Sequence, residues 1–262
     1  MEDKSINMIP KIIHYCWLSN EPFPNLIRTC MDSWKRYLPD YEFKRWSLEN
    51  FDINSVLFVK EAYECRKWAF AADYIRLYAL FREGGIYLDS DVLLKKSLDP
   101  FLLNRAFSAI EYNSSAFNKS LNMNIVDESG ELLIDKMSIP GLQIQAAVIG
   151  SIKNNEYIRA CMNYYENTSF ILNNGSYNAD IIAPDIMAYH ARNYGFKYKD
   201  EIQDLDVIKI YPSETFAGHP ALATKNTYAI HCCNGSWREK TLQRRIINYI
   251  RKNLAIRFLH KK

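Results

Sequence analysis

The sequence lacks any apolar run near the roughly 18–20 residues that a membrane-spanning helix requires. Its N-terminal stretch, Met1 to Ser19, also lacks the long apolar segment and small-residue cleavage site of a secretory signal peptide. The six cysteines include no CxxC pair and no spacing typical of a zinc site. We therefore expect a cytoplasmic protein whose cysteines are small buried thiols.

A strong excess of one charge is also missing, since the net charge is +3. This balance hides an asymmetry: residues 238–262 hold nine basic residues and one acidic residue, and the remainder is mildly acidic. An acidic body argues against a nucleic-acid groove. With 48% hydrophobic and 24% charged residues, the 262-residue chain is typical of a soluble globular protein. Because no repeat or linker is visible, we expect one domain over residues 1–240, followed by a separate C-terminal segment.

Short apolar segments alternate with helical patterns along the chain. Residues 11–17 predict a buried strand, residues 26–38 an amphipathic helix, and residues 41–46 a second strand. This β-α-β order predicts an α/β fold with a site at the carboxyl edge of its sheet. Later we expect helices over 65–82, 154–166 and 179–190, strands over 86–88, 92–94, 106–111, 207–211 and 228–231, an irregular loop over 112–141, and a short apolar segment over 142–149.

Two acidic residues follow the predicted strand 86–88, in the sequence Asp89-Ser90-Asp91. Alternate residues of an extended chain point to the same side, so these carboxylates can act together. Two hard oxygen ligands suit Mg²⁺ or Mn²⁺, which prefer a few carboxylates together with phosphate oxygens. The alternative interpretation of this tripeptide alone is a solvated turn between two strands.

The predicted helix before this motif is apolar nearly all round from Trp68 to Phe81, and Asp73 and Arg76 are its only charged residues there. Residues three apart are neighbours on a helix, so the two side chains can pair. One interpretation is a structural ion pair. The other is a polar pair at a pocket wall, where Asp73 accepts sugar hydroxyls and Arg76 orients an anionic group.

Further candidates lie at the two ends of the chain. His231 ends a predicted strand and can be a third metal ligand, and Ser236 and Trp237 can donate hydrogen bonds to a diphosphate. Trp17 leaves the first strand, where an aromatic ring can stack on a nucleobase. Taken singly, His231 is better explained as a structural histidine and Trp17 as a core residue.

The order of these motifs is more specific than any one of them. The aromatic strand 11–17, the helix with Asp73-x-x-Arg76, the hairpin Gly84-Gly-Ile-Tyr-Leu-Asp-Ser-Asp91 and the late His231 resemble the DXD sugar transferases of glycosyltransferase family 32. The large clostridial glucosylating toxins share the same motifs more distantly. The resemblance is dense over residues 9–101, returns near 228–237, and is thin between.

The resemblance implies a GT-A type nucleotide-sugar-binding fold, with a mixed central sheet flanked by helices, that transfers a hexose with retention of configuration. It implies Asp89 and Asp91 as ligands of Mn²⁺ or Mg²⁺, and His231 as a ligand of the metal or the diphosphate. It further implies that a UDP-linked donor contacts Asp73 and Arg76 through its sugar. The remaining implied donor contacts are Trp17 on the uracil, Tyr87 beneath the donor, and Ser236 and Trp237 on the leaving diphosphate. Gln143, Gln145 and Asp185 are candidates for the sugar or acceptor pocket.

Two other functions stay open at this stage. The sequence around Asp89 resembles the first motif of haloacid-dehalogenase phosphatases, in which that aspartate is the nucleophile, although no Gly-Asp dipeptide follows. A non-catalytic carbohydrate-binding protein is the second alternative.

The C-terminal segment, residues 241–262, has apolar residues every four positions and basic residues over much of its remainder. This pattern predicts a basic amphipathic helix, which suits an anionic membrane surface. Its alternative is a terminal helix packed on the domain. Because the family's fungal Golgi members carry an N-terminal anchor that this sequence lacks, we expect a bacterial enzyme of capsule or other surface-polysaccharide synthesis. We expect it to act on a lipid-linked saccharide at the inner face of the plasma membrane.

Overall fold

The computed structural model describes residues 8–232. In chain order its main elements are β1 (Ile12–Cys16), α1 (Asn25–Tyr37), β2 (Glu42–Trp46), α2 (Leu57–Glu64), α3 (Trp68–Glu83), β3 (Gly85–Leu88), β4 (Val92–Leu94), β5 (Ala106–Tyr112), α4 (Ser114–Asn122), β6 (Leu142–Ile144), β7 (Val148–Ser151), α5 (Glu156–Glu166), α6 (Ala183–Ala191), β8 (Gln203–Asp204), β9 (Lys209–Tyr211), β10 (Phe216–Ala217) and β11 (Ala229–His231). The predicted C-terminal helix, Cys233, Ser236 and Trp237 lie outside the described residues.

The described strands form two sheets. The larger has eight strands in the order β2-β1-β3-β7-β5-β9-β8, with β6 paired to β5, and the smaller has the order β10-β11-β4. Strands β1, β2 and β3 run parallel, whereas β7 is antiparallel to both β3 and β5. The prediction of an α/β fold with a mixed central sheet is therefore confirmed.

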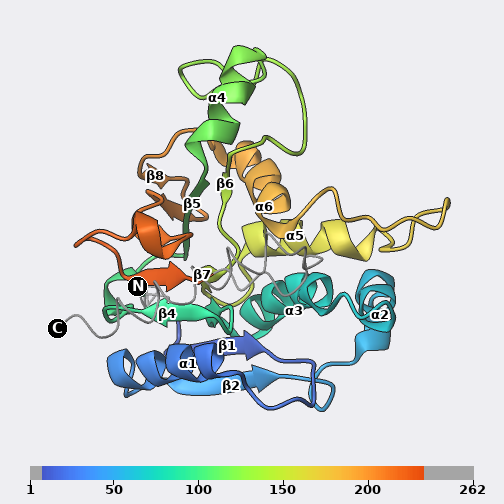
Figure 1. Cartoon of the computed structure of the whole chain (residues 1–262), viewed down its shortest axis with the longest axis vertical. Helices are drawn as coiled ribbons and strands as arrows, with labels where there is room; N and C mark the ends of the chain where they lie inside the picture. Colours follow the sequence, from blue (N-terminus) through green and yellow to red (C-terminus); the bar gives the residue numbers. More distant parts are fainter. Residues whose placement is uncertain (1–7, 233–262) are drawn as a thin grey trace, which may run out of the picture.

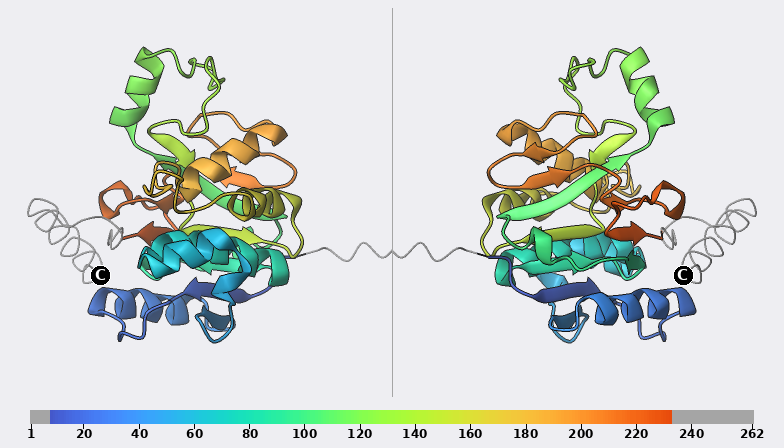
Figure 2. Two further views of the ribbon diagram at one scale, coloured as in Figure 1. Left: turned by 90° about the vertical axis from the view of Figure 1, so that its right-hand side faces the viewer. Right: turned by 90° about the vertical axis from the view of Figure 1, so that its left-hand side faces the viewer.

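Helices cover both faces of the large sheet. Successive residues of a strand point to opposite sides, so a strand can contribute side chains to two hydrophobic cores. In β3, Tyr87 joins the core formed with α2, α3, α5 and α6, while Ile86 and Leu88 join the core that contains Trp34 of α1. Figure 1 shows α1 beside β1 and β2 at one end of the molecule and α4 at the other. Figure 2 shows that α4 projects from the body of the fold.

Three expected segments differ from the structure. The helix expected over 179–190 begins only at Ala183. The helix expected over 65–82 begins at Trp68, because Arg66 has a left-handed φ of 56° that separates it from the shorter helix α2. The loop expected over 112–141 contains α4, whose first turn is capped by the Asn113 side chain accepting from the amide of Ala116. Its polar composition concealed buried apolar residues, including Ile139.

Among the described residues, no helix is long and apolar enough to cross a membrane. The division into a domain over 1–240 and a separate tail stays a prediction.

His14 of β1 connects this strand to β2 and to the C-terminal end of α3. It is fully buried; its Nε2 lies 2.7 Å from the carbonyl oxygen of Gly84, and its Nδ1 accepts from the Trp46 indole at 3.1 Å. Because Nδ1 accepts, the ring is neutral and Nε2 carries the proton. Gly85 is needed beside it, since a Cβ there would lie 2.9 Å from His14 Nε2. Burial lowers the pKa of His14.

We predict that His14 makes the fold acid-sensitive. The unfolded chain gains a proton on His14 below its ordinary pKa of 6.5, while the folded protein resists it. The stabilisation is therefore present above pH 6.5 and is lost as the pH falls toward the lowered pKa, by at most about 1.4 kcal/mol per pH unit. Urea unfolding at pH 7.5 and pH 5.5 measures this.

The variant His14→Gln serves as the comparison. We expect it to be less stable at pH 7.5, by about 1–3 kcal/mol, because a buried hydrogen bond is lost. Its stability should also fall less between the two pH values. An equal fall in both proteins would show that other groups cause the acid sensitivity.

Candidate active site

Asp89 and Asp91 flank the turn between β3 and β4, at the carboxyl end of a buried strand. The amide of Asp89 donates to the carbonyl of Ala147, and the amide of Val92 donates to the carbonyl of Asp89, each at 2.9 Å. The first bond continues the pairing of β3 with β7, and the second closes the turn. The backbone therefore holds both carboxylates at one place on the sheet edge.

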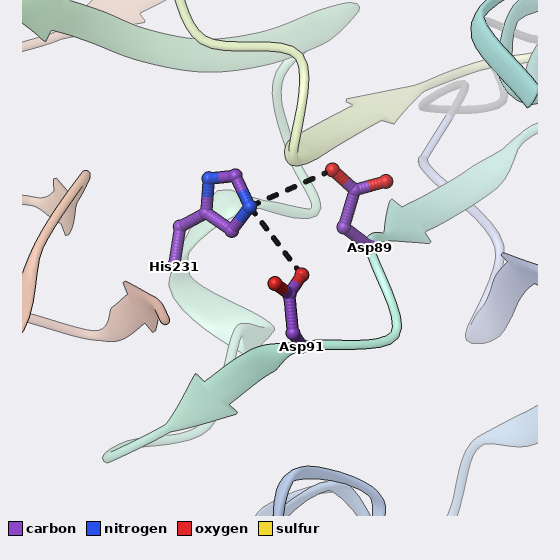
Figure 3. Close-up of side chains that lie close together, drawn as sticks. All are labelled: Asp89, Asp91 and His231. Carbon is purple, nitrogen blue, oxygen red and sulfur yellow. Dashed lines mark ion pairs between the residues drawn. The ribbon is translucent and has the colours of Figure 1, made fainter. Parts of the chain in front are cut away.

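His231 completes a cluster with these two carboxylates (Figure 3). It pairs with Val92 across the antiparallel strands β11 and β4. Its Nε2 lies 3.3 Å from Asp91 Oδ1 and 3.8 Å from Asp89 Oδ2. The amide of Cys232 donates to the carbonyl of Asp91, which fixes the strand end beside the turn.

The cluster fits a divalent cation. One ligand atom from each of the three residues lies within 4.8 Å of the others, and all three side chains are partly exposed. Carboxylate oxygens are the ligands that Mg²⁺ and Mn²⁺ prefer, and their remaining positions are commonly filled by water or phosphate oxygens. Without a cation, adjacent carboxylates repel each other. The predicted ligands are thus brought together, and their role stays a prediction.

Arg76 connects helix α3 to this cluster. Its Nη2 lies 2.7 Å from Asp73 Oδ1 and 3.4 Å from Asp89 Oδ1, and its Nη1 donates to the carbonyl of Ala146 at 2.7 Å. The guanidinium also lies over the Tyr87 ring, 4.9 Å from its centre. The ion pair with Asp73 is therefore not confined to the helix but is part of the sheet edge.

Burial sets the protonation of the groups around Arg76. It raises the pKa of Asp73 to about 7, against the opposing attraction of Arg76. It also raises the pKa of Tyr87 well above its usual value, so the phenol stays protonated and donates to Asp89 Oδ1 at 3.1 Å. Burial raises the pKa of Cys16 to about 12, which excludes a reactive thiolate there.

Trp17 lies at the same edge because β1 and β3 are parallel. Its ring is half-buried and packs edge-on against Phe23, with centres 4.8 Å apart, and its indole donates to the carbonyl of Glu21. It is not a core tryptophan, unlike Trp34 and Trp46.

In the segment between β6 and β7, the sequence indicates Gln145 only as a candidate for the sugar or acceptor pocket. Gln145 is buried, donates to the carbonyl of Phe216, and has a side-chain oxygen without a hydrogen-bond partner among the described residues. The next residue, Ala146, supplies the carbonyl that Arg76 binds. A backbone contact of this kind leaves no mark in the sequence. Gln143 instead binds Asp185, which caps α6.

Solved structures of similar shape include glycosyltransferases. The PaToxG glycosyltransferase matches with a TM-score of 0.44 and 16% identity, over 72% of this chain and 73% of that chain. The galactosyltransferase LgtC, solved with donor and acceptor sugar analogues, matches with a TM-score of 0.43 and 15% identity, over 94% of this chain and 95% of that chain.

Curated relatives match a limited part of the sequence. Inositol phosphoceramide mannosyltransferase 3 of Schizosaccharomyces pombe is 35% identical over 101 residues, which cover 36% of this chain and 27% of that protein. An uncharacterised glycosyltransferase of Acanthamoeba polyphaga mimivirus is 34% identical over 103 residues, 36% of this chain and 40% of that protein. The match thus spans between about a quarter and two fifths of these relatives.

Residues 24–108 match the family described as the glycosyltransferase sugar-binding region containing the DXD motif. This range runs from α1 to β5 and includes the Asp73–Arg76 pair and the acidic turn. The resemblance to the DXD sugar transferases is therefore confirmed. Residues 24–108 are thus similar to the sugar-binding region of the DXD glycosyltransferases, and this range contains the sequence Asp89-Ser90-Asp91.

Proposed function

We propose that this protein is a metal-dependent, retaining glycosyltransferase that moves a hexose from a UDP-linked donor to a saccharide acceptor. The observation that carries the proposal is the meeting of Asp89, Asp91 and His231 beside the buried Asp73–Arg76 pair, inside the matched region. The cluster suits the diphosphate of a donor, and the pair suits its sugar. Mn²⁺ or Mg²⁺ would be held by Asp89, Asp91 and His231.

A divalent cation bound there would neutralise the negative charge that grows on the leaving diphosphate. The residues of the chain prepare that site. Arg76 holds one oxygen of Asp89, while the other oxygen faces His231. Asp73, when ionised, offers its remaining oxygen to sugar hydroxyls, and Trp17 supplies a ring for the base. The donor is thereby held at both ends, which lowers the entropic part of the barrier.

For the transfer step we propose attack from the face that the diphosphate leaves. The acceptor oxygen forms its bond to the anomeric carbon as the bond to the diphosphate oxygen breaks, and the acceptor proton passes to the leaving phosphate. Asp73 is poorly suited to act as a covalent nucleophile, because Arg76 binds its carboxylate at 2.7 Å. Retention of configuration then needs no second carboxylate.

We further propose a lipid-linked acceptor used in bacterial capsule or other surface-polysaccharide synthesis, with the enzyme cytoplasmic and attached peripherally to the inner face of the membrane. The matched yeast relative supports a lipid acceptor, since its name gives an inositol phosphoceramide as the molecule that receives mannose. The basic, apolar pattern of residues 241–262 supports attachment to an anionic surface.

The two alternative functions lead to different observable outcomes. A phosphatase would hydrolyse a phosphomonoester and carry phosphate on Asp89. A non-catalytic carbohydrate-binding protein would bind glycan without releasing sugar from a nucleotide. Metal-dependent release or transfer of sugar from a nucleotide-sugar would distinguish the proposed enzyme from both.

We predict that Asp89→Asn and Asp91→Asn each reduce metal-dependent hydrolysis of the preferred nucleotide-sugar at least a hundredfold. Each change removes a charged ligand that positions the leaving diphosphate. The measurement is sugar release with Mn²⁺ from a panel that includes UDP-hexoses and nucleotide-linked mannose. The exposed Asp32→Asn variant is the matched control and should keep normal turnover. Near-normal turnover in either DXD variant would contradict the metal role.

We predict that Asp73→Asn separates sugar binding from nucleotide binding. With Mn²⁺ present, calorimetry should show the affinity for UDP unchanged within twofold, while the added affinity gained from the sugar is lost. The reason is that Asp73 is the proposed sugar ligand, and Arg76 lies between it and the proposed metal ligand Asp89. Equal losses for UDP and the nucleotide-sugar would show that the change disturbs the whole site through Arg76.

We predict that residues 241–262 bind anionic vesicles. Binding should fall steeply with salt and disappear when these residues are deleted, because each basic residue near such a surface contributes about 1 kcal/mol. Sedimentation with phosphatidylglycerol vesicles measures it, and hydrolysis of the soluble donor by the shortened chain is the control. Unchanged vesicle binding would contradict the membrane proposal, and an insoluble shortened chain would favour packing of the segment on the domain.

A further inference from the structure

A cavity of about 410 Å³ is lined by residues that do not belong to the metal-ligand cluster. Its walls come from the segment after β2, from the middle of α3 and from the last residue of α5. The residues that matter for its chemistry are Asn50, Phe51, Asp52, Tyr74, Tyr78 and Glu166.

One wall of this cavity comes from a segment at the sheet edge that carries the DXD motif. The segment after β2 leaves the same edge as Asp89, because β2, β1 and β3 are parallel. Tyr74 and Tyr78 of the cavity lie on α3, as does Asp73 of the candidate active site. At about 100° per residue, Tyr74 and Tyr78 point about 100–140° away from Asp73 around the helix. The cavity is therefore a neighbour of the donor site and not part of it.

Aromatic rings form the floor of the cavity. The centre of the Phe51 ring lies 6.2 Å from that of Tyr74 and 5.3 Å from that of Tyr78, and the two tyrosine centres are 6.3 Å apart. At these distances the rings pack on one another, which leaves no space for a cation between them. The floor is therefore a packed apolar surface and not an aromatic cage.

Polar groups form the rim. Exposed Asp52 uses one carboxylate oxygen to cap the short helix at Ile53–Ser55, accepting from the amide of Asn54 at 2.9 Å, and Asn50 lies beside it. Tyr74 donates to Glu166 at 2.9 Å, and Arg159 pairs with the same carboxylate. Arg159 thus offsets the charge of Glu166, so Asp52 carries the net negative charge of the cavity.

These features select the class of ligand. A negative rim with no lysine or arginine among the lining residues disfavours phosphates and carboxylates. A packed aromatic floor disfavours a caged ammonium group. An apolar floor with carboxylate and amide groups at its rim suits a sugar ring, whose face is apolar and whose edge carries hydroxyl groups. We propose that this cavity binds a saccharide unit of the acceptor, remote from the unit that is glycosylated; this assignment of the acceptor rests on the proposed function.

Direct binding tests the cavity without the transfer reaction. The probes are α-1,2-mannobiose, maltose and lactose, titrated by saturation-transfer NMR into the full chain without metal or nucleotide. We expect saturable binding of at least one disaccharide. Asp52→Asn, which replaces one acceptor oxygen with a donor amide, and Tyr78→Phe, which removes one hydroxyl, should each weaken it three- to tenfold. The matched control Glu49→Gln removes a charge from the same segment outside the cavity and should bind normally. Melting temperatures of all variants establish that they are folded.

Four results would overturn the proposal: no saturable binding of any probe, equal binding by Asp52→Asn and Glu49→Gln, displacement of the disaccharide by UDP with Mn²⁺, or displacement by tetramethylammonium. The third would make the cavity part of the donor site, and the fourth would make it a cation site. Failure of the proposed function is a separate result, because absence of metal-dependent sugar release leaves the disaccharide titration unaffected.

Discussion

The site depends on one buried cation, the guanidinium of Arg76. It lies between the carboxylates of Asp73 and Asp89 and also binds the backbone carbonyl of Ala146. Two carboxylates this close would repel each other, and burying either alone would be costly. The guanidinium of Arg76 opposes both effects, and it links α3 to the turn after β3 and to the segment between β6 and β7. Because a buried charge left without its partner is strongly destabilising, this contact constrains the fold as well as the site.

The topology places the remaining groups around that contact. Parallel pairing of β1 with β3 brings Trp17 to the same edge as the acidic turn, and antiparallel pairing of β11 with β4 brings His231 there from the far end of the described chain. The two sheets therefore meet at the DXD turn. Ligands of open α/β sheets commonly bind at the carboxyl ends of the strands. The separate cavity takes its walls from the segment after β2, from α3 and from the last residue of α5.

Local sequence patterns predict much of the fold and of the candidate active site. The first β-α-β unit, the acidic pair after a strand and the Asp73–Arg76 spacing are visible because each depends on residues close in sequence. The short helix α2, the helix α4 and the contact of Arg76 with Ala146 were not predicted. Helix α4 lies in a polar segment whose apolar residues are buried only by tertiary packing. The contact with Ala146 depends on the pairing of distant strands and on a carbonyl group, which every residue possesses.

The central claim is that the DXD turn and His231 hold a metal–diphosphate complex. Crystals soaked with UDP and Mn²⁺ test it most directly, because anomalous scattering from manganese locates the ion without assumptions about activity. The account predicts one strong anomalous peak bounded by Asp89, Asp91 and His231, next to density for the diphosphate. Nucleotide density with no manganese peak there, or with the ion bound elsewhere, would contradict it.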